Sequence, residues 1–277
     1  MLCTIISLLI CVFLYKILTN KVEHFTFDKK KVFESDNDVK WCKVLSKKES
    51  QTLLTSFDDG FLEKLGKSPI NLHVRRIKTV DEYVEKIQNE ITYGCREISE
   101  KIINDSINYI QNIPINLPWL DEKKFKAMPW VVCVTDSSSL YEEGYPHTRF
   151  SNAGGHCIII PKHAISTTKN FVILLLHEQM HNYQRKYNTE FNEWLYSSGW
   201  STIKHDTQSH RINPDALINN DMLWQKDGNV HLCRFLEDDY GYTYPSLSNV
   251  EFEPKPKSSS EHPNECYAYK DSEKIIG

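Results

Sequence analysis

Two histidines and a glutamate stand close together in residues 171–183, which read FVILLLHEQMHNY. His177 and His181 are four residues apart, so an α-helix places both rings on one face, about 6 Å from each other. Two imidazoles in this arrangement can bind one metal ion, typically Zn²⁺. Glu178 directly follows the first histidine and would lie near a water molecule on that metal. The spacing therefore predicts a metal-activated water with Glu178 as its general base.

The residues around this motif indicate that the helix is buried. The six residues before His177 are all apolar, and Met180 and Tyr183 continue the apolar character. A helix that is apolar on nearly every side packs inside a protein. Histidine and glutamate are costly to bury without a partner, and a metal ion supplies one. The alternative is a surface helix with two incidental histidines, which the apolar flank disfavours.

A catalytic zinc ion usually has three protein ligands and a water molecule, so a third ligand is needed. The extended motif HExxHxxGxxH is excluded, because Gln184 and Tyr187 stand where its glycine and histidine would be. The place of the glutamate in aminopeptidase-type sites holds Trp200 and Ser201. The candidates that remain are Glu265, His205, His210 and His262.

The segment around Glu265 has a helical signature of its own. The sequence His262-Pro263-Asn264-Glu265 is followed, one helical turn later, by Ala268. Proline is favoured at the start of a helix, so Glu265 would lie in a first turn. The segment therefore has an NExxA pattern on a second helix.

An HExxH helix followed by a distant NExxA helix resembles the gluzincin branch of the zincin metallopeptidases. In that branch the glutamate of the second helix is the third zinc ligand, which implies Glu265 here. A longer pattern, PHTR at 146–149, HExxHxxQR at 177–185, RINPD at 211–215 and HPNE at 262–265, resembles predicted metalloproteases of large DNA viruses. The resemblance covers residues 140–270. It implies one Zn²⁺ ion and a peptide or protein substrate.

Further side chains could assist at such a site. A tyrosine, histidine or arginine near the metal can stabilise an oxyanion, and a carboxylate can orient a ligand histidine. Asp215 would suit that orienting role, although a turn after Pro214 explains this residue slightly better. The candidates for these roles are Tyr183, His210, Arg211, Asp215, Tyr267 and Tyr269.

A strand with a glycine start precedes the helix. Zincin-like proteases bind extended peptides along an edge strand through main-chain hydrogen bonds, and residues 154–160 could form that strand. Gly155 would let a substrate backbone approach closely. An ordinary core strand after a glycine turn explains the segment equally well. Substrate-binding candidates just upstream, which could also be loop residues, are His147, Thr148 and Arg149.

The remaining pattern predicts helices first and a small sheet afterwards. A helix is expected within residues 38–66, and a longer one runs from the capping box at 79–82 to Pro114 with Ile98, Ile102 and Tyr109 on its apolar stripe. Strands are expected at 130–135, 157–160, 222–226 and 229–235, the last two joined by Asp227-Gly228. This order predicts an α+β fold, a zincin-like domain with a small mixed sheet and the HExxH helix.

The N-terminus predicts a membrane anchor. Residues 2–18 are almost wholly apolar, which is about the minimum length for a bilayer span. A small-residue cleavage site is missing after them, which favours an uncleaved anchor over a signal peptide. Lysines gather on the C-terminal side, so the positive-inside rule places the folded part in the cytosol. The expected organisation is an anchor at 1–19, a linker at 20–37 and a peptidase domain at 38–277, with a helical part at 38–113 and a catalytic part at 114–277.

Composition limits the other possibilities. The 277 residues carry a net charge of −4, which gives no electrostatic basis for nucleic-acid binding. The expected function is a single-pass membrane protein that hydrolyses peptide bonds. One alternative is a catalytically inactive structural or interaction protein with a zincin fold, on a membrane or virion. Another is a different zinc hydrolase, such as an amidase or a deformylase-like enzyme.

Overall fold

A computed structural model describes residues 42–50, 97–135, 146–150, 156–204, 211–212, 222–235, 250–253 and 262–277. The predicted anchor at 1–19 and linker at 20–37 lie outside these residues, as do residues 79–96 of the long helix. Among the helices so described, none combines the length and the apolar character that a membrane span requires.

The main sheet has four strands in the order β1-β2-β4-β3, with β1 (Cys42–Val44), β2 (Trp130–Thr135), β3 (His147–Phe150) and β4 (His156–Pro161). The strands β1, β2 and β4 are parallel, whereas β3 is antiparallel to β4. Every residue of β4 is buried, as its apolar run HCIIIP suggests. The prediction at 130–135 is confirmed, and the strand predicted at 157–160 extends one residue further at each end.

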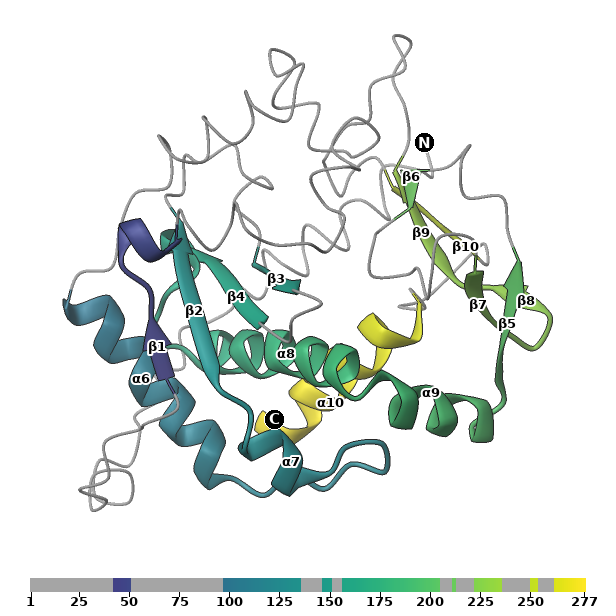
Figure 1. Ribbon diagram of the computed structural model, residues 1–277, viewed down its shortest axis with the longest axis horizontal. Coiled ribbons are helices and arrows are strands. Elements are labelled where there is room, and N and C mark those ends of the chain that lie inside the picture. The colour runs from purple at the N-terminus through teal and green to yellow at the C-terminus, as the bar shows by residue number, and fades with distance from the viewer. Residues whose placement is uncertain are drawn as a thin grey trace, which may run out of the picture.

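Among the described residues, the helices that surround or extend this sheet include α6 (Glu97–Asn112), α7 (Glu122–Lys126), α8 (Lys169–Lys186), α9 (Asn188–Ser197) and α10 (Pro263–Ile276). A short 3-10 helix, η4 (Lys162–Ala164), leads from β4 toward α8. The helix α8 packs against α6, α9 and α10 and against the strands β3 and β4. Figure 1 shows α8 at the centre of the fold, below the main sheet and across α10. The HExxH segment is therefore the central helix of the molecule.

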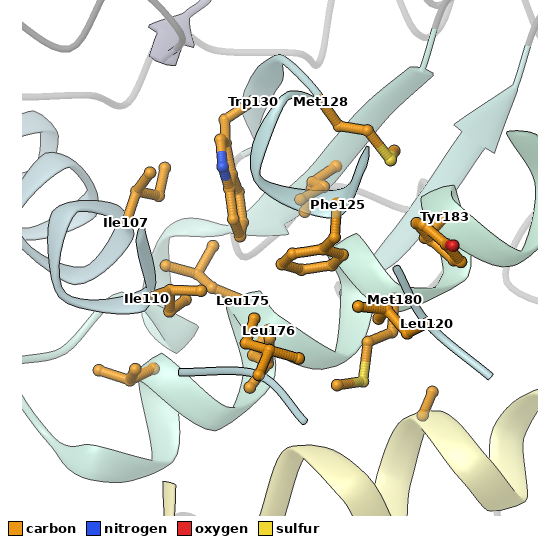
Figure 2. Close-up of a cluster of buried hydrophobic side chains, with 14 of the residues drawn as sticks. Ile107, Ile110, Leu120, Phe125, Met128, Trp130, Leu175, Leu176, Met180 and Tyr183 are labelled. Atoms are coloured by element: carbon orange, nitrogen blue, oxygen red, sulfur yellow. The ribbon is translucent and has the colours of Figure 1, made fainter. Parts of the chain in front are cut away.

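The hydrophobic core fills the space between α8, α6, α7 and the main sheet. Leu175 and Leu176 of α8 are fully buried, as are Ile107 and Ile110 of α6. Figure 2 shows these side chains together with Phe125 and the other labelled core residues. Burial of so many large side chains around α8 fixes the rotation of this helix about its axis. The faces of α8 that carry His177 and Tyr183 are thereby directed to different sides.

Two smaller sheets lie on the C-terminal side of α8. One has the order β5-β7-β8, with β5 (Trp200–Lys204), β7 (Met222–Lys226) and β8 (Asn229–Val230). The other has the order β10-β9-β6, with β6 (Arg211–Ile212), β9 (Leu232–Phe235) and β10 (Val250–Glu253). Together with the helices, these sheets confirm a mixed fold with small sheets, as α+β predicts.

The predicted hairpin at Asp227-Gly228 is present between β7 and β8. Asp227 has φ 52° and Gly228 has φ 76°, which is the left-handed pair that a two-residue type I′ turn requires. The second predicted strand, 229–235, is divided. Its first part pairs with β7, but Leu232–Phe235 pairs with β6 and β10 in the other sheet. The sequence of residues 229–235 does not indicate that the pairing partner changes from β7 to β6 and β10.

The prediction of helix within residues 38–66 is wrong for residues 42–44. These form β1, which pairs in parallel with β2, and the Leu45 amide donates to the Val132 carbonyl at 2.8 Å. Tertiary pairing has overridden the local pattern. Helical structure begins only at Lys47, after Ser46. There the Ser46 amide donates to Glu49 Oε2 at 2.9 Å and the Glu49 amide to Ser46 Oγ at 3.3 Å, which is a capping box.

The apolar stripe of α6 also differs from the prediction. Ile98, expected to face the core, is 72% exposed. Ile102 and Tyr109 are partly buried and pack against the core, as predicted, but the fully buried residues are Ile103, Ile107 and Ile110, all with 0% exposure. They are four and three residues apart and form a helical stripe of their own. The sequence of α6 contains two overlapping apolar stripes, and the second is the more deeply buried one where α6 packs against α8.

Candidate metal centre

The helix α8 brings His177 and His181 together as their spacing predicts. Their Nε2 atoms are 3.0 Å apart, and the ring centroids are 4.5 Å apart with the planes nearly perpendicular. Glu178 is 4% exposed. Its charge acts on the neighbouring His181 and contributes to raising the pKa of that ring. Two imidazoles and one carboxylate therefore share a buried part of a single helix.

The helix α10 supplies the third candidate ligand, Glu265. Its Oε2 atom is 3.4 Å from His177 Nε2, and its Oε1 atom is 3.3 Å from His181 Nε2. In the described part of the chain, these three residues form a group that could hold a metal ion, with ligand atoms within 4.8 Å of one another. Of the rival third ligands, His262 is outside this group, and His205 and His210 lie outside the described residues.

Several contacts fix α10 against the rest of the fold. Pro263 occupies the start of the helix, as predicted, after His262 at the N-cap. Ala268 is fully buried in the core. Near the middle of the helix, the Trp119 Nε1 atom donates to Asp271 Oδ2 at 2.7 Å. These contacts hold the first turn of α10, and with it Glu265, at the face of α8 that carries the two histidines.

The three groups strongly influence one another's protonation. Burial by itself would raise the pKa of Glu265, but the adjacent His181 and His177 rings lower that pKa well below its ordinary value. Burial likewise opposes the charged form of His181, yet the Glu265 carboxylate raises the pKa of His181. The Glu265 carboxylate and the His181 ring thus compensate for each other's burial across 3.3 Å. A bound cation would take the place of a proton on a ligand group.

Gln184 connects the two ligand-bearing helices, a role that the sequence did not reveal. Its Oε1 atom lies 3.0 Å from His181 Nδ1, and its Nε2 atom donates to the Asn264 carbonyl at 3.0 Å. The only available signal was its place in the HExxHxxQR pattern. A glutamine three residues after a ligand histidine can accept from that ring, but its second partner depends on the packing of α10.

Tyr183 does not lie with the metal group, contrary to its candidacy as an oxyanion donor. It is 1% exposed, and its hydroxyl accepts a hydrogen bond from the Asp121 amide at 2.9 Å. Figure 2 shows the ring in the core, beyond Phe125 and Met180. The reason is helical geometry, because Tyr183 is two residues from His181 and therefore faces roughly the opposite side of α8.

The two tyrosines of α10 have different surroundings. The Tyr267 hydroxyl accepts from Trp200 Nε1 at 3.3 Å, and the ring packs on Trp194 with centroids 4.7 Å apart. Tyr269 is one turn after Glu265, and its ring centroid lies 6.4 Å from that of His177. Of the tyrosines proposed from the sequence, Tyr269 is therefore the one with a ring contact to the metal group.

The segment predicted as a substrate-binding edge strand does not lie at an edge of the sheet. Residues 156–161 form β4, which is paired with β2 on one side and β3 on the other. Both of its edges are therefore occupied. Among the described strands, β1 and β3 lie at the two edges of the sheet, and β3 carries His147, Thr148 and Arg149. The glycine run suggested the wrong strand, because strand order in a sheet cannot be read from a local pattern.

Thr148 anchors β3 to α8. The Arg185 Nη1 atom donates to the Thr148 hydroxyl at 2.6 Å and to its carbonyl at 3.1 Å. Thr148 is only 6% exposed. The threonine thus holds the strand next to the helix, one turn beyond His181.

The other residues named from the sequence are described only partly or not at all. Arg149 lies in β3 and Arg211 in β6, where the backbone pairing is described. Gly155, His210 and Asp215 lie outside the described residues.

Searches against protein-family models, curated proteins and solved structures gave no match to this chain.

Proposed function

We propose that this protein is a zinc-dependent hydrolase that cleaves peptide bonds. The observation that carries the proposal is the triangle formed by His177, His181 and Glu265, with Glu178 beside it. Two histidines and a glutamate are a ligand set of catalytic zinc sites, which keep one position open for water. The spacing of HExxH and NExxA in the sequence supports the same ligand set.

The size of the triangle fits a zinc ion. Zn–N and Zn–O bonds of roughly 2.0–2.2 Å at tetrahedral angles separate the ligand atoms by about 3.3 Å. The three separations here are 3.0, 3.3 and 3.4 Å. The three side chains would therefore need to move by only about a few tenths of an ångström to bind the ion.

Glu178 is the proposed general base. A zinc ion in this group would supply a Lewis acid and a water of lowered pKa. Glu178 adjoins His177 in the sequence and is 4% exposed, so few bulk water molecules compete for hydrogen bonds to its carboxylate. It would accept the proton from the attacking water and return it to the leaving amine. His177, His181 and Glu265 would hold the ion and remain chemically unchanged.

The sheet supports a peptide as the substrate. Among the described strands, β3 forms one edge of the main sheet, opposite β1, and α8 packs directly against it. An extended peptide can add to such an edge through main-chain hydrogen bonds, with side chains alternating between two sides. The Arg185–Thr148 contacts hold β3 close to the helix that carries the metal ligands. We therefore assign substrate binding to β3 in place of β4.

The test is a peptide-library cleavage assay on purified protein with bound zinc. The wild-type chain should cleave peptides, and Glu178→Gln should reduce the rate by about 10²–10⁴-fold while retaining the metal. Glu193→Gln, at an exposed position of α9, is the matched control and should cleave like the wild type. Unchanged cleavage by Glu178→Gln would show that the assigned base is wrong. A zinc-loaded wild type without hydrolase activity would refute the proposed function.

A further inference from the structure

Gln184 contacts both helices that carry candidate metal ligands. We propose that this single side chain positions His181 and Glu265 together and so determines how tightly the site binds its metal. The inference rests on the metal site of the proposed function and does not depend on hydrolysis. Gln184 is 2% exposed, so water cannot readily replace either of its hydrogen bonds.

The first bond fixes the proton on His181. An amide oxygen can only accept, so His181 Nδ1 must donate to Gln184 Oε1 across their 3.0 Å separation. A neutral ring that carries its proton on Nδ1 leaves the Nε2 lone pair available for a metal. That Nε2 atom is the one that faces His177 and Glu265. Gln184 thus selects the tautomer that a metal ligand needs.

The second bond fixes the first turn of α10. The Gln184 Nε2 group donates to the carbonyl of Asn264, the residue before Glu265, at 3.0 Å. Since the amide is planar, the position of its oxygen at His181 and that of its nitrogen at Asn264 depend on each other. Loss of Gln184 would therefore free the His181 ring and loosen the backbone next to Glu265 at the same time.

Gln179 provides a matched control on the same helix. It is fully buried and also makes two hydrogen bonds through its amide. Its Nε2 atom donates to the Pro129 carbonyl at 3.4 Å, and its Oε1 atom accepts from Asn182 at 3.0 Å. Neither partner is a candidate ligand, although Asn182 directly follows His181 along α8. A leucine at either position removes the same chemical group from the same buried helix.

The experiment measures zinc affinity by competition with a chelator. Gln184→Leu should weaken zinc binding by about 10–100-fold, the usual effect of losing the partner of a ligand histidine. Gln179→Leu should remain close to the wild type. Thermal unfolding of the metal-free proteins shows whether both variants are folded, and we expect similar losses of Tm. Equal zinc affinity in the two leucine variants would overturn the proposal.

Gln184→Glu separates the two bonds. A carboxylate still accepts the His181 Nδ1 proton, but it cannot donate to the Asn264 carbonyl. This variant should regain most of the zinc affinity lost in Gln184→Leu, while amide hydrogen exchange in the first turn of α10 stays faster than in the wild type. If Gln184→Leu does not fold, the Gln184→Glu variant alone tests the proposal. Amide hydrogen exchange in its α10 at the wild-type rate would then contradict the proposal. A wild-type chain that binds no zinc would refute the proposed function itself.

Discussion

The candidate metal ligands differ in how directly the sequence predicted their positions. His177 and His181 are neighbours on one helix, so a four-residue spacing is enough to bring their rings together. Glu265 comes from the end of the chain and was identified by resemblance to a two-helix motif, and the structure brings it to within 3.4 Å of both rings. Gln184 was missed because one of its partners is a backbone carbonyl of another helix, which no side-chain pattern reports.

Tyr183→Phe tests the position of that side chain. The change removes the hydroxyl that accepts from the Asp121 amide in a part-buried hydrogen bond. We expect the free energy of unfolding to fall by about 0.5–1.5 kcal/mol. The kcat for peptide cleavage should stay within a few-fold of the wild-type value, since the hydroxyl is on the core side of α8. A large loss of kcat with unchanged stability would instead place Tyr183 in the reaction.

At the scale of elements, long and strongly patterned segments were predictable and short ones were not. The central helix α8 and the strand β2 follow from runs of apolar residues. The three-residue strand β1 exists because β2 offers it a partner, so its own sequence does not reveal it. The same reason explains why β4 was wrongly expected at an edge of the sheet, because pairing between segments decides whether β4 or β3 lies there.

The contact between α8 and α10 determines the position of Glu265. Ala268 lies near the middle of α10 and has 0% exposure, so there is no room for a larger side chain. Ala268→Leu should lower the free energy of unfolding by about 1–3 kcal/mol through overpacking. It should also reduce the rise in Tm that zinc causes, because the displaced α10 moves Glu265 away from the histidines.

The control for this change is Lys270→Leu, which places leucine on the exposed side of the same helix. It should leave both the Tm and the effect of zinc on the Tm near their wild-type values. If Ala268→Leu lowered the Tm but zinc still raised it by the full wild-type amount, the docking of α10 would not control the site.

At the scale of the whole molecule, the sequence was sufficient for the α+β class but not for the arrangement of strands into three sheets. Residues 229–235 illustrate the limit, since one predicted strand contributes to two sheets. The membrane anchor at residues 2–18 and the cytosolic position of the folded part stay predictions from the sequence. If they hold, the proposed hydrolase acts next to a bilayer.

Two buried histidines make the folded state sensitive to acid. Burial, with the nearby Lys186 and Arg185, lowers the pKa of His156 to about 4, and burial lowers the pKa of His262 to about 3. In the unfolded chain both would titrate near about 6.5. Between pH 6 and 4 the unfolded chain therefore binds protons that the folded protein does not. The stability that these two uncharged histidines contribute is therefore fully present above their pKa in the unfolded chain, and it is lost as the pH falls below that pKa.

We expect each of these histidines to reduce the free energy of unfolding of the metal-free protein by up to about 1.4 kcal/mol per pH unit in that range. Urea unfolding at several pH values measures the slope. His262→Gln should make the slope shallower, whereas His163→Gln, at an exposed position, should not change it. An identical slope in His262→Gln and the wild type would show that His262 is not kept neutral by the fold.

The most direct test is the zinc content of the purified chain at neutral pH, determined by elemental analysis with Glu265→Gln and Glu273→Gln alongside. Both substitutions lie in α10 and remove one negative charge, but only Glu265 contacts the histidines. The wild type and Glu273→Gln should each hold one zinc ion per chain, and Glu265→Gln should lose it on dialysis. A wild-type chain without metal, or a Glu265→Gln variant that keeps zinc as tightly as the wild type, would contradict a His177–His181–Glu265 metal centre.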